Sequence, residues 1–305
     1  MKDPEPRGRP RRLVYFTPLR YPGGKAKLAA YVKQLMKVNH LLDGEYVEPY
    51  AGGAAIALEL LFQEYVQRIH INDLSRPVHA FWKSALHQTE ELCQLVGDTP
   101  LTVEAWDIQK GVLSSQAEHD DLAVGFATFF LNRTNRSGIL NAGIIGGRDQ
   151  TGPWKIDARY NPSELIHRIR AIARMRERIR LTRQDALQFL KAGIRRWPQK
   201  TLIYLDPPYY VKGRDLYYNF YQHNDHKGLS QFVRQKILRQ RWIVSYDNVP
   251  PIHDLYSGRP YVIYDIGYTA RSARRGDEVM FFCDGLKIPP LVGAINPLPE
   301  RLVSV

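Results

Sequence analysis

Cysteine is scarce in this sequence, with Cys93 and Cys283 the only two among 305 residues. Neither lies in a Cys-x-x-Cys or Cys/His spacing, which excludes a zinc site of those patterns and a disulfide framework. We therefore expect no metal site and a reducing, cytoplasmic setting. Long apolar runs are also missing. Because no stretch of about twenty apolar residues occurs, no segment is expected to span a membrane.

Acidic residues are fewer than basic ones. Asp and Glu number 31 against 43 Lys and Arg, a formal net charge of +12. This excess predicts a polyanionic partner such as nucleic acid, although a solvated basic face explains any single cluster equally simply. The first dozen residues hold Lys2 and several arginines among prolines and lack the apolar core of a secretory signal. They predict a disordered basic arm over residues 1–16.

One stretch carries a strong chemical pattern. Residues 202–205 are apolar and predict a buried strand, which must stop at Pro207 and Pro208 because proline cannot donate to a ladder. Asp206 is thereby held at a rigid turn as an acceptor, and Tyr209 offers a flat ring with a polar tip. Acceptors beside a stacking ring suit a planar amine, such as that of a nucleobase. A strand that merely ends in a proline turn is the alternative.

Two glycine turns precede helical patterns. Tyr21-Pro22-Gly23-Gly24-Lys25 leads into a helix predicted over 26–38, where exposed amides and Lys25 suit an anion; a plain turn is the alternative. Residues 45–55 read as strand, glycine turn and helix, the opening of a Rossmann-like sheet. A second strand, 68–71, ends at Asp73, where a carboxylate would meet a ribose. Without a full G-x-G-x-x-G, a single adenosine-type ligand is favoured. A turn with a helix-capping Asp73 is the alternative.

The sheet pattern lapses between about residues 77 and 179. Helices are predicted near 78–96 and 121–132, followed by a long loop over 133–161, and such loops are usually functional or disordered. The loop interleaves aromatic rings with side chains that bind phosphates and base edges, namely Arg133, Asn135, Arg136, Asn141, Arg148 and Lys155. A solvated surface loop is the alternative.

The remaining segments resume the sheet. A basic helix over about 163–178 either follows a phosphate backbone or is solvated, and strand 179–182 leads to Asp185, which would bind an adenine amine or cap a helix. Beyond residue 206 we expect a tyrosine-rich loop, a helix, a basic loop able to reach DNA, and a loose tail over 289–305. The helix is predicted over 227–239, strands over 242–247, 261–266 and 278–283, and the basic loop over 268–276.

Five motifs in this order resemble the Dam-like, D12-class DNA adenine N6-methyltransferase family. They are Tyr21-Pro22-Gly23-Gly24-Lys25, Val47-Glu48-Pro49-Tyr50-Ala51-Gly52-Gly53, Asn72-Asp73, Phe130-Leu131-Asn132-Arg133 and Leu205-Asp206-Pro207-Pro208-Tyr209. The resemblance runs from about residue 19 to 284. It implies an α/β fold: a Rossmann-like S-adenosylmethionine-dependent methyltransferase sheet in two parts, 17–76 and 162–288, with an inserted, mainly helical DNA-recognition region over 77–161.

The resemblance also assigns roles to residues. It implies S-adenosyl-L-methionine as methyl donor and double-stranded DNA as substrate, with one adenine flipped out of the duplex. The catalytic element would be Asp206, Pro207, Pro208 and Tyr209. The cofactor would be bound by Tyr21, Gly24, Lys25, Glu48, Tyr50, Gly52, Asp73 and Asp185. The predicted DNA contacts are Arg133, Asn135, Arg136, Asn141 and Lys155.

One departure from the family concerns the glycine turn. The family pattern is usually Gly-x-Gly, whereas Gly52-Gly53 is followed here by Ala54, and alanine resists the positive φ that glycine tolerates. Rival functions are transfer to cytosine N4, transfer to RNA, and a binding protein that has kept the fold but lost activity. Further expectations are a cognate restriction endonuclease as partner, a role in restriction–modification or epigenetic marking, and a monomer or weak dimer.

Overall fold

The structure is a computed structural model that describes residues 16–20, 25–210, 221–265, 277–292 and 296–297. Several predictions fall outside these residues: the cofactor contacts Tyr21 and Gly24, almost all of the basic arm, the basic loop 268–276 and most of the tail 289–305. Most of the predicted tyrosine-rich loop also lies outside them.

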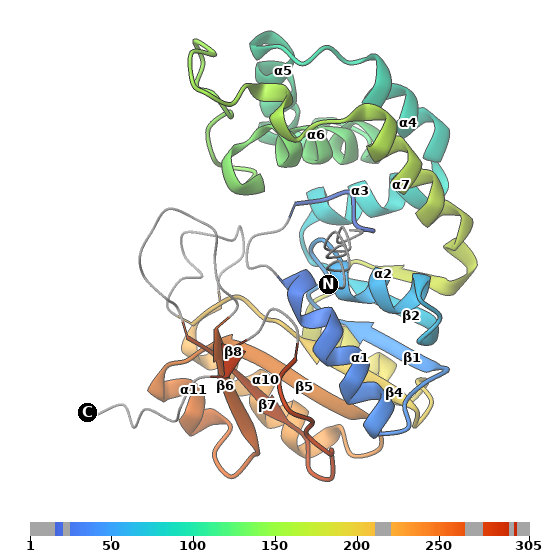
Figure 1. Cartoon of the computed structure of the whole chain (residues 1–305), viewed down its shortest axis with the longest axis vertical. Coiled ribbons are helices and arrows are strands. Elements are labelled where there is room, and N and C mark those ends of the chain that lie inside the picture. Colours follow the sequence, from blue (N-terminus) through green and yellow to red (C-terminus); the bar gives the residue numbers. More distant parts are fainter. Residues whose placement is uncertain (1–15, 21–24, 211–220, 266–276, 293–295, 298–305) are drawn as a thin grey trace, which may run out of the picture.

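A single mostly parallel sheet forms the centre of the molecule (Figure 1). Its strands stand in the order β3-β2-β1-β4-β5-β7-β6-β8, with the first five parallel and β7 antiparallel to both of its neighbours. The strands are β1 (Gly44–Glu48), β2 (Val66–Asn72), β3 (Ile179–Thr182), β4 (Thr201–Leu205), β5 (Arg241–Asp247), β6 (Tyr261–Asp265), β7 (Glu278–Phe282) and β8 (Asn296–Pro297). This arrangement confirms the predicted Rossmann-like α/β fold.

Every residue of β4 and β7 is buried. Strands with no exposed position are covered on both faces, as in parallel sheets with helices on each side. The helices that accompany the strands are α1 (Ala29–Val38), α2 (Ala55–Phe62), α8 (Ala186–Gly193), α10 (His223–Lys236) and α11 (Pro250–Leu255). Short 3₁₀ turns are η1 (Lys25–Leu28), η2 (Gln116–Glu118), η3 (Arg136–Gly138), η4 (Ile156–Arg159) and η5 (Arg176–Arg178).

The strand order reverses direction between β1 and β4. The chain leaves β1 toward β2 on one side, whereas β4 continues to β5 on the other. In open α/β sheets such a reversal leaves a crevice at the carboxyl ends of the two strands, and ligands bind there. Glu48 ends β1, and Asp206 directly follows β4. The topology therefore places the two predicted motifs on the two sides of that crevice.

The region between β2 and β3 is helical and lies at one end of the molecule, beyond the sheet (Figure 1). Its helices pack on one another and are α3 (Arg76–His87), α4 (Thr89–Asp98), α5 (Val103–Ser114), α6 (Asp121–Thr134) and α7 (Pro162–Arg174). The helix predicted over 78–96 is two helices, because Gln88 leaves the helical region with φ −130° and ψ 46°. Helix α5 was not predicted: only Ala105, Trp106 and Leu113 are buried in it, so its apolar pattern is weak.

Candidate active site

Asp206 stands at the carboxyl end of β4, beside β5. Leu205 pairs with Val244 in the register of these strands, so the next residues, Asp206 and Ser245, lie abreast. The Ser245 hydroxyl donates to Oδ1 of Asp206 at 2.8 Å, and Nζ of Lys25 lies 2.9 Å from the same oxygen. No described residue hydrogen-bonds to Oδ2. One carboxylate oxygen is therefore held firmly while the other is left for a ligand.

Glu278 is a site residue that the sequence analysis missed. It begins β7, and because β7 runs antiparallel its first residue lies at the edge where the parallel strands end. Its carboxylate is almost fully buried and accepts hydrogen bonds from the Tyr209 hydroxyl at 2.8 Å and the Tyr264 hydroxyl at 3.0 Å. Lys25 donates to it at 3.0 Å. The sequence signal that could have identified Glu278 is a glutamate at the start of an otherwise apolar strand.

The charges of this cluster are strongly coupled. Burial raises the pKa of Asp206, and the negative charge of Glu278 adds to the rise, while the Lys25 ammonium opposes it. Burial by itself lowers the pKa of Lys25, but Asp206 and Glu278 outweigh that effect and hold it well above its ordinary value. Lys25 therefore stays charged beside the two carboxyl groups, and its charge opposes the rise in the pKa of Asp206 that burial and Glu278 cause.

The turn after β4 is fixed by side chains of other strands. The Tyr210 N–H donates to Oδ1 of Asp247 at 2.8 Å, which ties the turn to the end of β5. The ammonium of Lys25 lies 5.6 Å from the centroid of the Tyr209 ring, within cation–π range. Pro207 and Pro208 lie between these tethers. The predicted catalytic element is thus held at both ends.

The glycine turn after β1 is also held by several segments. The Gly52 N–H donates to Asp73 at 2.9 Å, and the Gly52 carbonyl accepts from the indole of Trp82 at 2.8 Å. The Thr17 hydroxyl donates to the Gly53 carbonyl at 2.6 Å. Ala54 adopts φ +46° and ψ 35°, the left-handed conformation that alanine resists. The alanine therefore keeps a glycine-type loop, at a cost in backbone strain.

Two predicted cofactor carboxylates lie in this region. Asp73 accepts the Gly52 and Ser75 N–H groups, one on each oxygen, and burial raises its pKa to about 6 despite these bonds. Glu48 is buried and accepts from the Tyr46 hydroxyl and the Ala57 N–H. Burial raises the pKa of Glu48 to about 8. Both groups therefore have protein partners that fix their orientation.

Asn72 joins three strand ends. Its fully buried amide donates to the carbonyls of Pro49 and Gln184 and accepts from the Thr182 hydroxyl. These bonds hold the end of β3 next to that of β2. Asp185, predicted to bind the cofactor adenine, caps α8 by accepting the Gln188 N–H at 3.1 Å.

The predicted cofactor contact Tyr50 reaches across the site. Its hydroxyl lies 2.9 Å from that of Tyr221, and the two rings meet edge to face. Both rings are half-buried and pack against the core. Tyr50 therefore ties the end of β1 to the segment that leads into α10.

The predicted DNA contacts divide into exposed and internal residues. Arg136, Asn141 and Lys155 are exposed, as the prediction requires. Asn135 is not: its fully buried side chain accepts from the Trp106 indole at 2.6 Å and donates to the Ile139 and Leu140 carbonyls. It braces the loop from inside, so its prediction as a DNA contact is corrected. Whether a polar loop residue faces inward depends on packing that local sequence does not encode.

Arg133 is also largely internal. Only one weak bond is recorded for its guanidinium, to the Pro18 carbonyl at 3.5 Å, and its buried Nε has no partner among the described residues. The neighbouring Asn132 holds the main chain of Arg20. Its side-chain oxygen accepts the Arg20 N–H, and its side-chain amide donates to the Arg20 carbonyl, each at 2.7 Å. Asn132 belongs to the motif Phe130-Leu131-Asn132-Arg133, but no role was predicted for it.

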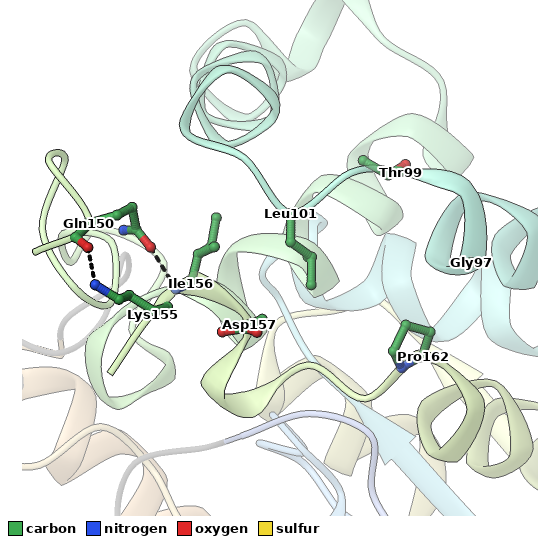
Figure 2. A pocket seen from close by; sticks show the side chains of 8 residues that line it. All are labelled: Gly97, Thr99, Leu101, Gln150, Lys155, Ile156, Asp157 and Pro162. Carbon is green, nitrogen blue, oxygen red and sulfur yellow. Dashed lines mark hydrogen bonds between the residues drawn. The ribbon is translucent and has the colours of Figure 1, made fainter. Parts of the chain in front are cut away.

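Several other basic residues of the helical region are paired with acids. Arg148 binds Asp107 through two bonds of 2.8 and 2.7 Å, and Arg170 binds Glu90. Arg170 lies on the predicted basic helix, and its pair favours the solvated alternative at that position. An open depression of about 570 Å³ lies among residues 97–162, with Lys155 on its wall (Figure 2). None of its lining residues belongs to the Asp206 cluster.

No group of three or more His, Cys, Asp or Glu side chains in the described part of the chain is placed to hold a metal ion. No helix among those residues is both long and apolar enough to cross a membrane.

Comparisons with known proteins give one informative match. The family model for "D12 class N6 adenine-specific DNA methyltransferase" matches residues 21–270. No curated protein matches the sequence. Two similar solved structures are a "conserved hypothetical protein" from Streptococcus pyogenes (10% identity, 80% of this chain and 88% of that one, TM-score 0.33) and "Putative methyltransferase yhhF" from Escherichia coli (10%, 83% and 84%, TM-score 0.31). At such TM-scores these two likenesses carry no weight for function.

Proposed function

We propose, from the premise that this chain belongs to the D12 class N6 adenine-specific DNA methyltransferase family, that it methylates adenine N6 in double-stranded DNA at a specific sequence. The family itself makes the chain an S-adenosylmethionine-dependent methyltransferase. The specific site, the duplex substrate and the flipping of the base are our proposal. A role in restriction–modification or epigenetic marking, with or without a cognate endonuclease, is proposed with them.

The observation that carries the proposal is the unequal use of the two oxygens of Asp206. Oδ1 is held by Lys25 and Ser245, while Oδ2 has no partner among the described residues. Oδ2 can therefore accept one N–H of an exocyclic amine, and the carbonyl of Pro207 would accept the other. The lone pair of such an amine is delocalised into the base. Two acceptors would draw the nitrogen toward tetrahedral geometry and make it a better nucleophile.

Proton movement follows from the same contact. When bound, S-adenosylmethionine would supply an electrophilic methyl group to N6, with its sulfur as the leaving group. N6 then carries one proton too many, and Oδ2 of Asp206, already bonded to that N–H, would accept it and release it to solvent. Asp206 must be ionised to accept this proton, and the charge of Lys25 favours the ionised form. Positioning and fixed charge thus carry the step.

The residues present fit the cofactor that the family implies. Each oxygen of Asp73 accepts one backbone N–H, and a carboxylate oxygen has room for a second bond, here from a ribose hydroxyl. Asp185 uses one oxygen as a helix cap and has acceptor capacity for an adenine amine. Lys25, Glu48, Tyr50 and Gly52 would line the remainder of the site. Tyr21 and Gly24 remain predictions.

Tyr209 would hold the target adenine by stacking. Its hydroxyl is fixed by Glu278, so the plane of the ring is set before the base arrives. Only 7% of Tyr209 is exposed, so we expect the side chains that cover it to move when a base enters. Unstacking a base costs a few kcal/mol, which stacking and the two amine contacts would offset.

The test is direct. Purified protein is incubated with labelled S-adenosylmethionine and genomic DNA lacking adenine methylation; the DNA is then digested to nucleosides, and modified positions are mapped by single-molecule sequencing. N6-methyladenine at one short motif is the expected result. Label in N4-methylcytosine would refute the base assignment. Absence of label despite cofactor and DNA binding would favour a binding protein, and label only in RNA would refute the substrate class.

A further inference from the structure

Four arginines from four separate segments meet where the helical region joins the irregular N-terminal segment of residues 16–20. They are Arg20 of that segment, Arg133 of α6, Arg159 of η4 and Arg168 of α7. Arg168 donates to the Thr17 carbonyl at 3.0 Å, and Arg133 approaches the next carbonyl, that of Pro18. Arg20 donates to the Asn135 carbonyl at 3.2 Å. These bonds bring the guanidinium groups of Arg168 and Arg133 to residues 16–20, and they tie that of Arg20 to the end of α6.

The positive charge of this arginine cluster is not balanced from within. The pKa of Arg133 is lowered by burial first and then by the charges of Arg20 and Arg168, and Arg159 lowers the pKa of Arg20 as well. Glu164 raises the pKa of Arg133, and it pairs with Arg168. Like charges gathered in this way, with Arg20 and Arg133 partly shielded from water, are costly without a counter-ion.

Two further observations indicate that the missing counter-ion is a ligand. The buried Nε of Arg133 has no hydrogen-bond partner among the described residues, and such donors are rarely left unpaired. Arg159 is exposed, and no described acid forms an ion pair with it. Arg148 and Arg170, by contrast, already bind carboxylates. Within the cluster Arg168 is also paired, with Glu164, so the free donor capacity lies in Arg133 and Arg159.

We propose that Arg20, Arg133, Arg159 and Arg168 form an anion site that takes a backbone phosphate of the DNA substrate, an inference that rests on the proposed function. Planar guanidinium forks match the geometry of phosphate oxygens. The place also favours the substrate over a free anion. Arg20 is clamped by Asn132 and lies five positions before Lys25, the cation on Asp206. A phosphate held here would anchor the duplex beside the segment that leads into the reaction site.

The test is the salt dependence of DNA binding. The variants are Arg159→Gln and Arg168→Gln, and the matched control is Arg170→Gln, which removes an exposed charge from α7 that is already paired with Glu90. Binding of a methylatable duplex and of an unrelated duplex is measured by fluorescence anisotropy at several KCl concentrations. Each lost phosphate contact should reduce the slope of log K against log[salt] by about 0.9, and by the same amount for both duplexes, because phosphate contacts carry no sequence information.

An unchanged slope in both Arg159→Gln and Arg168→Gln would overturn the proposal, as would an equal fall in Arg170→Gln. Thermal unfolding with inorganic phosphate alone distinguishes the source of the anion. If phosphate stabilises the wild type but not Arg159→Gln while the DNA slope stays unchanged, the site serves a free anion and the DNA assignment is wrong. A wild type that binds DNA with the expected slopes but transfers no methyl group would refute the proposed function and leave this site standing.

Discussion

The hydroxyl of Tyr209 donates a 2.8 Å hydrogen bond to Glu278, a residue 69 positions later in the chain. The same carboxylate accepts from Lys25, which in turn binds Asp206. One buried glutamate therefore connects Tyr209, proposed to stack on the base, with Asp206, proposed to accept a hydrogen bond from the amine of that base. Glu278 does not touch the reacting atoms in this scheme; it positions the groups that do.

We expect Glu278→Gln to lower kcat/KM for methyl transfer by roughly ten- to a hundredfold. The substitution removes a charge that receives three hydrogen bonds, and a bond to a charged group is worth about 1.5–3 kcal/mol. Fluorescence of a duplex with 2-aminopurine at the target position should also change, because the Tyr209 ring is no longer fixed. Glu64→Gln, at a surface glutamate paired with Arg178, is the control. Activity within twofold of the wild type would contradict the positioning role.

Asp206→Asn should lose at least about a hundredfold in kcat, the scale seen when a preorganised charge-stabilising group is removed. Cofactor affinity, measured by calorimetry, should change little, because no predicted cofactor contact is removed. Ser245→Ala is the graded comparison: it deletes one bond to Oδ1, worth about 1 kcal/mol, so a loss of about fivefold is expected. Equal losses in the two variants would argue against a direct role for the carboxylate.

Lys25→Met should move the acid limb of the pH–kcat/KM profile to higher pH. Burial already raises the pKa of Asp206 and the Lys25 charge opposes that rise, so removing the charge raises the pKa further. An opposite charge at this range lowers a carboxyl pKa by about one to three units, and a shift of that size is expected. Lys33→Met, which breaks an ion pair with Glu59 away from the site, should leave the limb in place. A profile that does not move would refute the coupling.

Glu48 should make the protein less stable as pH rises through neutrality. Burial raises its pKa to about 8 from the ordinary value of 4.5, so the native state binds more protons than the unfolded state between those pH values. The free energy of unfolding should then fall with rising pH, with a slope of up to about 1.4 kcal/mol per pH unit. Glu48→Gln cannot titrate and should lose this component, whereas Glu118→Gln, at an exposed position, should retain it. Urea unfolding without cofactor at pH 5.5, 6.5 and 7.5 measures the slopes; parallel curves for wild type and Glu48→Gln would disprove the assignment.

Ala54→Gly should stabilise the fold by up to about 1 kcal/mol. The left-handed conformation at Ala54 costs an alanine roughly 1–2 kcal/mol, and the greater freedom of glycine in the unfolded chain returns about 0.4–1 kcal/mol of that. Ala57→Gly, within the helix α2, should instead destabilise by about 1 kcal/mol. Thermal unfolding of the two variants compares these signs directly. Destabilisation by Ala54→Gly would show that the alanine methyl contributes more by packing than it costs in strain.

Local chemistry was enough to predict β1 to β7, whereas β8 falls in the segment that was predicted to be a loose tail. The apolar run before Asp206 forms β4 and stops where the prolines begin, because proline has no N–H for the ladder. Strand 179–182 was predicted to the residue. The split of helix 78–96 at Gln88 and the helix α5 were not predicted, because neither left a clear apolar period in the sequence.

The sequence by itself determined the α/β fold, the order of the motifs and the presence of Asp206 at a strand end, since each depends on neighbours a few positions away. Tertiary structure alone decided which groups meet. Lys25 reaches Glu278 across 253 positions and Ser245 across 220, and Asn135 turns inward while Arg136 faces solvent. Strand order and packing bring such residues together, and no local period records them. The chemistry of the site is therefore local in its residue types and long-range in its geometry.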